Sequence, residues 1–269
     1  MNENKSVIGI DIGSSTTKII ELKNNQIASK KILRKKYDKK ELENFCEINN
    51  IKYIEKIIFT GIGSDKIEQK DYSIPIEKVE EFTAIATGGL HLSKKESAII
   101  VSVGTGTALI EAKKKNIRHL GGSGVGAGTL FNMCKQFLNI ENFDEILELS
   151  KKGDISKIDL RIKDITDKEI TTLPPYLTLS NFGKFEDNAQ NEDLVLGLVN
   201  MVFEVIGMMA AFATINSDIK EVVVIGNITA IPVAQEVLKK IEFTHNIKFE
   251  VPENTEYAVV LGAIKSSGY

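Results

Sequence analysis

The sequence predicts an α/β fold of two related lobes, each carrying a hairpin that faces a shared cleft. Strand-like and helix-like apolar patterns alternate along the chain. The segment 7–22 is expected to form strand, turn and strand, and this layout recurs at 97–120. Gly104 follows Gly13 by 91 positions. A single duplication at that distance indicates two similar domains side by side rather than a solenoid.

The first hairpin, VIGIDIGSSTTKIIEL, turns on glycine and hydroxyl residues. Such a turn leaves several backbone N–H groups free to point at one anion, which suits a phosphate group. Asp11 directly precedes the turn and offers a carboxylate that can hold a divalent cation. Alone, the segment fits an ordinary tight turn equally well. Its recurrence at 101–109 favours a clamp with two phosphate-binding sides.

The remaining elements follow from hydrophobic periodicity and from turn residues. These elements are strands at 27–32, 53–60, 221–225 and 247–251, and helices at 39–50, 77–92, 129–138, 140–152, 232–241 and 257–266. A glycine-rich loop at 121–128 precedes the third of these helices, whose N-terminus favours an anion. The domain boundary is expected near 93–96, which divides the chain into residues 1–95 and 96–269.

Composition narrows the possible functions. The net charge is −3, from 34 basic and 37 acidic residues, so nothing favours nucleic acid or an anionic membrane as a partner. Cys46 and Cys134 match no metal spacing and are interpreted as reduced thiols of a cytoplasmic protein. The apolar segment 194–215 contains Asn200 and Glu204, so it is expected to be a buried helix of a core or subunit interface rather than a membrane span.

Four motifs stand in a recognisable order: GIDIGSSTTK at 9–18, VGTGT at 103–107, GGSGVGAG at 121–128 and VVVIGN at 222–227. This order resembles the ATPase superfamily of actin, sugar kinases and heat-shock chaperones. The resemblance implies two duplicated actin-like (ribonuclease H-like) lobes with an ATP cleft between them. With GDISKIDLRIKDI and LTLSNFG added, nearly the whole chain resembles type II pantothenate kinases.

That resemblance implies an enzyme that uses ATP and magnesium to phosphorylate pantothenate, the first step toward coenzyme A. Asp11 would orient magnesium. The residues implied to bind ATP are Asp11, Gly13, Ser14, Ser15, Thr16, Lys18, Gly104, Thr105, Gly106, Thr107, Gly121, Gly122, Gly226 and Asn227. A homodimer is expected, and coenzyme A or its acyl thioesters are expected inhibitors.

The resemblance also implies which residues act on the acceptor. Glu81 aligns with the family's general base, although its place in the first turn of a helix and the neighbouring Glu80 leave two alternatives open. The family has an arginine where this chain has His119, and Arg118 can replace it only if a bulge turns its side chain to the other face. Substrate contacts are implied for a further set: Thr105 and His119, with Thr178 and Leu179 reaching in from the partner subunit.

Two other functions remain open from the sequence. A kinase for a different small hydroxyl compound is suggested by His119. An ATP-driven activator of a radical dehydratase is suggested by GIDIGSSTTK, but such activators share an iron–sulfur cluster, and Cys46 and Cys134 do not provide paired ligands.

Overall fold

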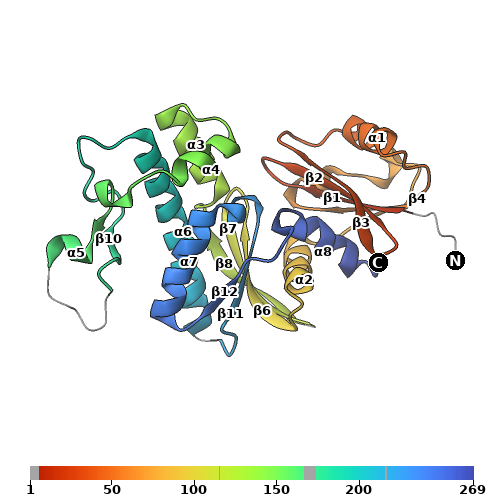
Figure 1. Ribbon diagram of the computed structural model, residues 1–269. Coiled ribbons are helices and arrows are strands. Elements are labelled where there is room, and N and C mark those ends of the chain that lie inside the picture. The colour runs from red at the N-terminus through yellow and green to blue at the C-terminus, as the bar shows by residue number, and fades with distance from the viewer. Residues whose placement is uncertain (1–5, 115, 167–173, 216) are drawn as a thin grey trace.

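The computed structural model describes residues 6–114, 116–166, 174–215 and 217–269, and it contains two five-stranded mixed sheets (Figure 1). The first sheet has the order β3-β2-β1-β4-β5, and the second has the order β12-β11-β6-β7-β8. In both, three strands joined by hairpins are extended by two parallel strands. The two orders are the same when one is read backwards, which confirms the duplicated α/β lobes.

The bounds of the elements follow the sequence closely. In the first lobe they are β1 Ser6–Ile12, β2 Thr17–Lys23, β3 Gln26–Leu33, α1 Lys39–Ile48, β4 Ile54–Thr60, β5 Ile76–Lys78 and α2 Glu81–Ser93. In the rest of the chain they are β6 Ser97–Val103, β7 Thr107–Lys113, β8 Asn116–Ser123, α3 Ala127–Leu138, α4 Phe143–Ser150, β9 Leu160–Arg161, α5 Ile162–Ile165, β10 Thr178–Ser180, α6 Asn191–Ile215, β11 Glu221–Ile225, α7 Pro232–His245, β12 Lys248–Glu250 and α8 Ala258–Ser266.

The helix predicted at 77–92 begins later than expected. Ile76–Lys78 forms the short strand β5, which pairs in parallel with β4. Glu80 then has an extended backbone and caps α2, so the helix starts at Glu81. The acidic run from Glu77 suggested an earlier start, but strand pairing with β4 took its first residues. The correction places Glu81 in the first turn of the helix.

Helices α2 and α8 lie between the two sheets (Figure 1). They approach closely because Gly88 faces the Ala258 carbonyl and Gly262 faces the Ala84 carbonyl, where any Cβ would clash. Both helices share one apolar core with residues of both sheets, so α8, although C-terminal in the chain, packs against β1 of the first lobe. The expected boundary near residue 95 lies in the turn between α2 and β6.

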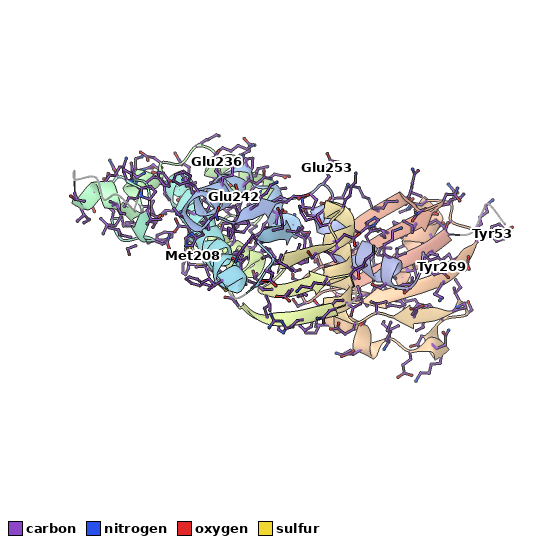
Figure 2. The ribbon with its side chains drawn as sticks, turned by 90° about the horizontal axis from the view of Figure 1, so that it is seen from below. Tyr53, Met208, Glu236, Glu242, Glu253 and Tyr269 are labelled. Atoms are coloured by element: carbon purple, nitrogen blue, oxygen red, sulfur yellow. The ribbon has the colours of Figure 1, made fainter. Side chains whose placement is uncertain are left out.

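The other face of the second sheet carries α3, α4, α6 and α7. In Figure 2, Met208 marks α6 and Glu236 and Glu242 mark α7, and all three lie at the end of the molecule far from Tyr53. Helix α6 is the one described helix that is long and apolar enough to cross a membrane, and 61% of its most apolar window is buried inside the protein. Its Asn200 is buried and donates to Asp159 at 2.7 Å. The expectation of a buried helix in 194–215 fits this packing.

Candidate active site between the two hairpins

The turns of the two hairpins touch. The Ser14 and Ser15 hydroxyls lie 2.7 Å and 3.0 Å from the Thr105 hydroxyl. The first turn is closed by a hydrogen bond of 2.9 Å from the Gly13 N–H to the Thr16 carbonyl. Residues 91 positions apart in the sequence therefore meet across the space between the lobes. This is the arrangement that the repeated motif predicted.

A buried aspartate lies beside this contact. Asp11 is paired in register with Lys18 on β2 and with Thr60 on β4. Its carboxylate is 3.7 Å from the Lys18 ammonium. Burial raises the pKa of Asp11, and the Lys18 charge acts against that shift. A buried carboxylate with one cation at the limit of ion-pair distance retains the capacity to attract a further cation.

The sequence left Glu80 and Glu81 as alternatives, and their surroundings differ. The Glu80 carboxylate accepts three hydrogen bonds, from the Phe82 N–H at 3.0 Å and from the Thr83 N–H and hydroxyl at 2.8 Å and 3.1 Å. It is thus engaged as the cap of α2. The Glu81 carboxylate has none of these bonds, and burial followed by the Asp11 charge raises its pKa. Glu81 is therefore the carboxylate that lies near Asp11 with its oxygens available.

The glycine-rich loop holds α3 against the second hairpin. The N–H groups of Ala127 and Gly128 donate to the carbonyls of Gly104 and Thr105 at 2.8 Å and 3.0 Å. A Cβ on Gly126 would lie 2.7 Å from the Gly106 carbonyl oxygen. The N–H groups of the first two residues of α3 therefore hold the loop 104–107 and are not free for an anion.

Two further glycines predicted to contact the nucleotide lie beside the same hairpin. Gly122 sits against the Thr107 carbonyl in the β7–β8 pairing. Gly121 has a φ of 135° and no atom near the position of a Cβ, so its surroundings are open. Both lie at the end of β8, on the edge of the sheet that leads into the glycine-rich loop.

The loop after β11 contains Gly226 and Asn227, the residues predicted to contact the adenosine. Gly226 has a φ of 131° and lies against the Val103 carbonyl, where a side chain would clash. Hydroxyls of Thr229 and Thr255 donate to its carbonyl at 2.8 Å and 3.2 Å. The adjacent Asn227 has a buried side-chain oxygen with no hydrogen-bond partner in the described residues. An unpaired acceptor of this kind fits a ligand amino group, as the prediction for an adenosine contact requires.

The edge strand β8 contains a β-bulge. A bulge was the condition under which Arg118 could replace the arginine of the family. Leu109 pairs with Gly121 and Ile110 pairs with His119, so Leu120 is an extra residue between them. A bulge shifts every side chain before it to the opposite face relative to those after it. Ile110 belongs to the core shared with α2 and α8, whereas Leu109 belongs to the core under α6. His119 therefore shares the α2 face.

Side-chain contacts agree with that register. The His119 ring stacks on the Phe82 ring with centroids 4.2 Å apart and planes 12° from parallel. Arg118 instead donates to Glu111 at 3.0 Å, and Ser217 donates to the same carboxylate at 3.1 Å. Arg118 thus lies on the α6 face, and the structure does not bring it to Glu81. The bulge exists, but it turns His119 and not Arg118 toward α2.

The predicted acceptor residues of the LTLSNFG segment lie elsewhere in this chain. The Thr178 hydroxyl donates to Glu204 at 2.6 Å, and Asn181 donates to the same carboxylate at 2.8 Å. Leu179 is exposed on β10. These residues project from the α6 side of the second lobe, so within one chain they are separate from the two hairpins (Figure 1).

The donor set fits magnesium carried by a nucleotide. No group of three or more His, Cys, Asp or Glu side chains within the described ranges could hold a metal ion by itself. Magnesium is usually held by one or two carboxylates together with substrate phosphates and water. Asp11 supplies one such carboxylate near the end of β1, two residues before the turn begins at Gly13.

Sequence reasoning missed Thr60 and Gly61. The Thr60 hydroxyl is fully buried and has no hydrogen bond among the described residues. A Cβ on Gly61 would lie 2.6 Å from the Asp11 carboxylate oxygen, so glycine lets β4 end beside that carboxylate. The available signal was the TGIG sequence directly after an apolar strand parallel to β1.

Two lobes with the same strand order, joined by paired hairpin turns beside a buried aspartate, define the actin-like ATPase fold. Solved structures agree. The activator of 2-hydroxyisocaproyl-CoA dehydratase from Clostridium difficile, with bound ADPNP, has a TM-score of 0.68 at 17% identity, covering 97% of each chain. Component A of the Acidaminococcus fermentans (R)-2-hydroxyglutaryl-CoA dehydratase has a TM-score of 0.67 at 16% identity, covering 96% of this chain and 95% of that one. At these identities the likeness shows the fold alone.

Within that fold, the chain belongs to the Fumble family, whose sequence pattern matches residues 94–247, more than half of the chain. Among curated proteins it is similar to the type II pantothenate kinase of Bacillus anthracis, with 28% identity over 233 residues and 83% of each chain covered. It is also similar to that of Staphylococcus aureus strain bovine RF122, with 28% identity over 230 residues, covering 82% of this chain and 84% of that one.

Proposed function

We propose that this protein is a pantothenate kinase that transfers the γ-phosphoryl group of ATP to the terminal hydroxyl of pantothenate. The product would be 4'-phosphopantothenate, the first intermediate toward coenzyme A. The observation that carries the proposal is the position of Glu81, a carboxylate without a hydrogen bond in the described residues that lies near Asp11 and Lys18 of the first hairpin. Similarity to type II pantothenate kinases over most of the chain supports pantothenate as the acceptor.

In this proposal the protein supplies positioning and charge, which phosphoryl transfer chiefly needs. Backbone groups of Gly13 to Thr16 and of Gly104 to Thr107 hold the phosphates from two sides, with Lys18 adding positive charge. Asp11 holds magnesium, which when bound neutralises charge on the phosphates. Gly226 and Asn227 contact the adenosine. The raised pKa of Glu81 suits a group that must take up a proton.

The reaction balances with these groups alone. Glu81 accepts the proton of the acceptor hydroxyl while the oxygen of that hydroxyl forms a bond to the γ-phosphorus. The bond from that phosphorus to the oxygen bridging the β-phosphate breaks, and ADP leaves with the electron pair. His119, which stacks on Phe82 beside Glu81, and Thr105, which meets the first hairpin turn, are proposed to contact the acceptor. Arg118, predicted as a catalytic residue, has no part in this step, because it lies on the α6 face and pairs with Glu111.

The test is direct. Purified protein with magnesium and ATP should convert pantothenate to phosphopantothenate, identified by mass spectrometry, with equal ADP release in a coupled assay. Glu81→Gln should abolish nearly all product. Absence of product from the wild-type protein, or equal product from Glu81→Gln, would refute the proposal. A panel of small hydroxyl compounds in the same assay would reveal a different acceptor.

A homodimer is proposed as the working form, with the second copy bringing Thr178 and Leu179 to the acceptor. Exposed apolar side chains on the α6 side support it, namely Tyr176, Leu179, Phe185, Phe212 and Ile215. Light scattering of the purified protein should give twice the mass of the chain. We further propose a cytoplasmic location and inhibition by coenzyme A or its thioesters, which a titration in the coupled assay would measure.

The alternative of a dehydratase activator rests on fold likeness to two such proteins. The chain's two cysteines lie on α1 and α3, in different lobes. Burial raises the pKa of each thiol to about 11, which opposes the thiolate that iron ligation needs. The kinase is therefore the function that this chain supports best.

A further inference from the structure

The contact between Phe82 and His119 joins the edge of the second sheet to the first turn of α2. Phe82 follows Glu81 directly, and its N–H is one of the groups that Glu80 caps. The ring of His119 covers the ring of Phe82 in a nearly parallel stack. An aromatic pair in this geometry restrains both partners beyond simple area burial.

The stack holds α2 at its N-terminal end, where a restraint on the helix has the most effect. Residues at the beginning of a helix lack intrahelical partners for their N–H groups, so helix ends open more easily than centres. Here that end carries Glu81, whose carboxylate has no hydrogen bond from the described residues to hold it. Beyond the Glu80 cap, the Phe82 side chain helps to hold this turn, because it packs against the apolar core around α2 and α8 and stacks on His119.

The bulge in β8 makes this contact available. With Leu120 as the extra residue, His119 faces α2 beside Ile110, which belongs to the core around that helix. The His119 side chain is otherwise exposed, and its ring nitrogens make no hydrogen bond within the described ranges. Among the described residues, Phe82 is the aromatic side chain on which the His119 ring stacks.

We propose that His119 is a positioning residue for Glu81, acting through the stacked ring of Phe82 rather than only through a contact with the acceptor. The inference rests on the proposed function, because positioning Glu81 matters only if Glu81 takes the acceptor proton. Misplacing a reacting group by about an ångström lowers the rate substantially. Loss of the stack should therefore lower kcat more than it changes the KM for either substrate.

Three variants and a control test this. His119→Ala removes the ring, His119→Phe keeps a stacking ring without its nitrogens, and Phe82→Leu removes the other partner. Ile117→Ala is the matched control, because Ile117 is an exposed residue two positions earlier on the same strand. Each is assayed for kcat and KM with magnesium, ATP and pantothenate. Hydrogen exchange of a peptide spanning residues 80–86 reports the first turn of α2 without needing an acceptor.

His119→Ala and Phe82→Leu should each lower kcat roughly tenfold and speed exchange of the 80–86 peptide roughly three- to tenfold. The double variant should lose little more than either single one, as expected for one shared contact. His119→Phe should recover most of the lost kcat and protection, and Ile117→Ala should resemble the wild type.

The proposal would be overturned if hydrogen exchange were unchanged in His119→Ala. It would also be overturned if His119→Phe were as defective as His119→Ala and had a raised KM for pantothenate. Either result would assign His119 to direct contact with the acceptor. If the wild-type protein does not phosphorylate pantothenate, the proposed function fails. The exchange experiment would still show whether His119 orders the start of α2.

Discussion

Replacing the two neighbouring glutamates separately distinguishes the base from the cap. Glu81→Gln removes a carboxylate that no described residue holds, whereas Glu80→Gln changes one that accepts hydrogen bonds from Phe82 and Thr83. Both substitutions preserve size and remove one negative charge. They differ in what the carboxylate does in the structure.

The magnitudes follow from those roles. General-base catalysis contributes about 10²–10⁴ in rate, so Glu81→Gln should lower kcat by that factor, or roughly 3–5 kcal/mol in activation free energy. Glu80→Gln keeps one oxygen for the Phe82 N–H and loses the bonds from Thr83. A weakened cap costs about 1 kcal/mol, which lowers Tm by roughly 2–4 °C for a chain of this size. It should leave kcat within about threefold of wild type.

The dependence of kcat on pH is an independent test of Glu81 as the base. Burial and the nearby Asp11 charge raise the pKa of Glu81 above its ordinary value. A base works as the carboxylate, so kcat should rise with pH through that raised pKa and then level off. Because the folded state binds this proton more tightly than the unfolded chain, the associated stability is present at low pH and is lost as the pH rises through the folded pKa.

The assay is ADP release coupled to a chromogenic reaction between pH 4.5 and 8, with Tm measured on the same samples. In Glu81→Gln the acidic limb of the kcat profile should disappear. The reasoning is refuted if Glu81→Gln retains kcat and its acidic limb while Glu80→Gln loses them.

Three other substitutions probe the surrounding groups. Gly226→Ala should lower Tm and weaken ATP binding in a nucleotide titration, because its φ of 131° and the adjacent Val103 carbonyl leave no room for a Cβ; wild-type affinity would contradict the close approach. Thr60→Val should leave Tm equal or slightly higher, since it removes an unpaired buried hydroxyl, but should lower kcat if that hydroxyl serves a ligand, with Thr60→Ser as the control. Lys18→Met should raise the KM for ATP, since it removes the cation 3.7 Å from Asp11, and an unchanged KM would exclude Lys18 from phosphate binding.

The duplicated lobes were readable from the sequence because strand, turn and strand patterns are local and repeat at a fixed distance. The hairpin Val7 to Leu22 needs only two buried apolar strands and a turn of small residues, and its copy needs the same. The start of α2 was harder, since acidic residues from Glu77 onward fit a helix N-terminus, and pairing of Ile76–Lys78 with β4 overrode that preference.

The residues of the candidate site likewise divide into those that local motifs predict and those that depend on tertiary packing. Motif order alone predicted Asp11, the two glycine and hydroxyl turns, and the loop at Gly226, because each lies within a few residues of a strand end. It did not predict Thr60, which reaches Asp11 only through the parallel pairing of β1 with β4. Nor could it choose between Glu80 and Glu81, because that depends on which backbone N–H groups each carboxylate meets once α2 has its cap.

By itself the sequence determined the two-lobed architecture and the residue types available for phosphate, metal and proton transfer, since these depend on local periodicity and chemistry. Only the tertiary structure decided which basic residue of β8 faces α2, the helix that carries Glu81. One extra residue, Leu120, reverses the faces of Arg118 and His119, and a register shift of this kind is set by packing of the strand against its partner and the core. The structure thereby places Arg118 with Glu111 and His119 on Phe82.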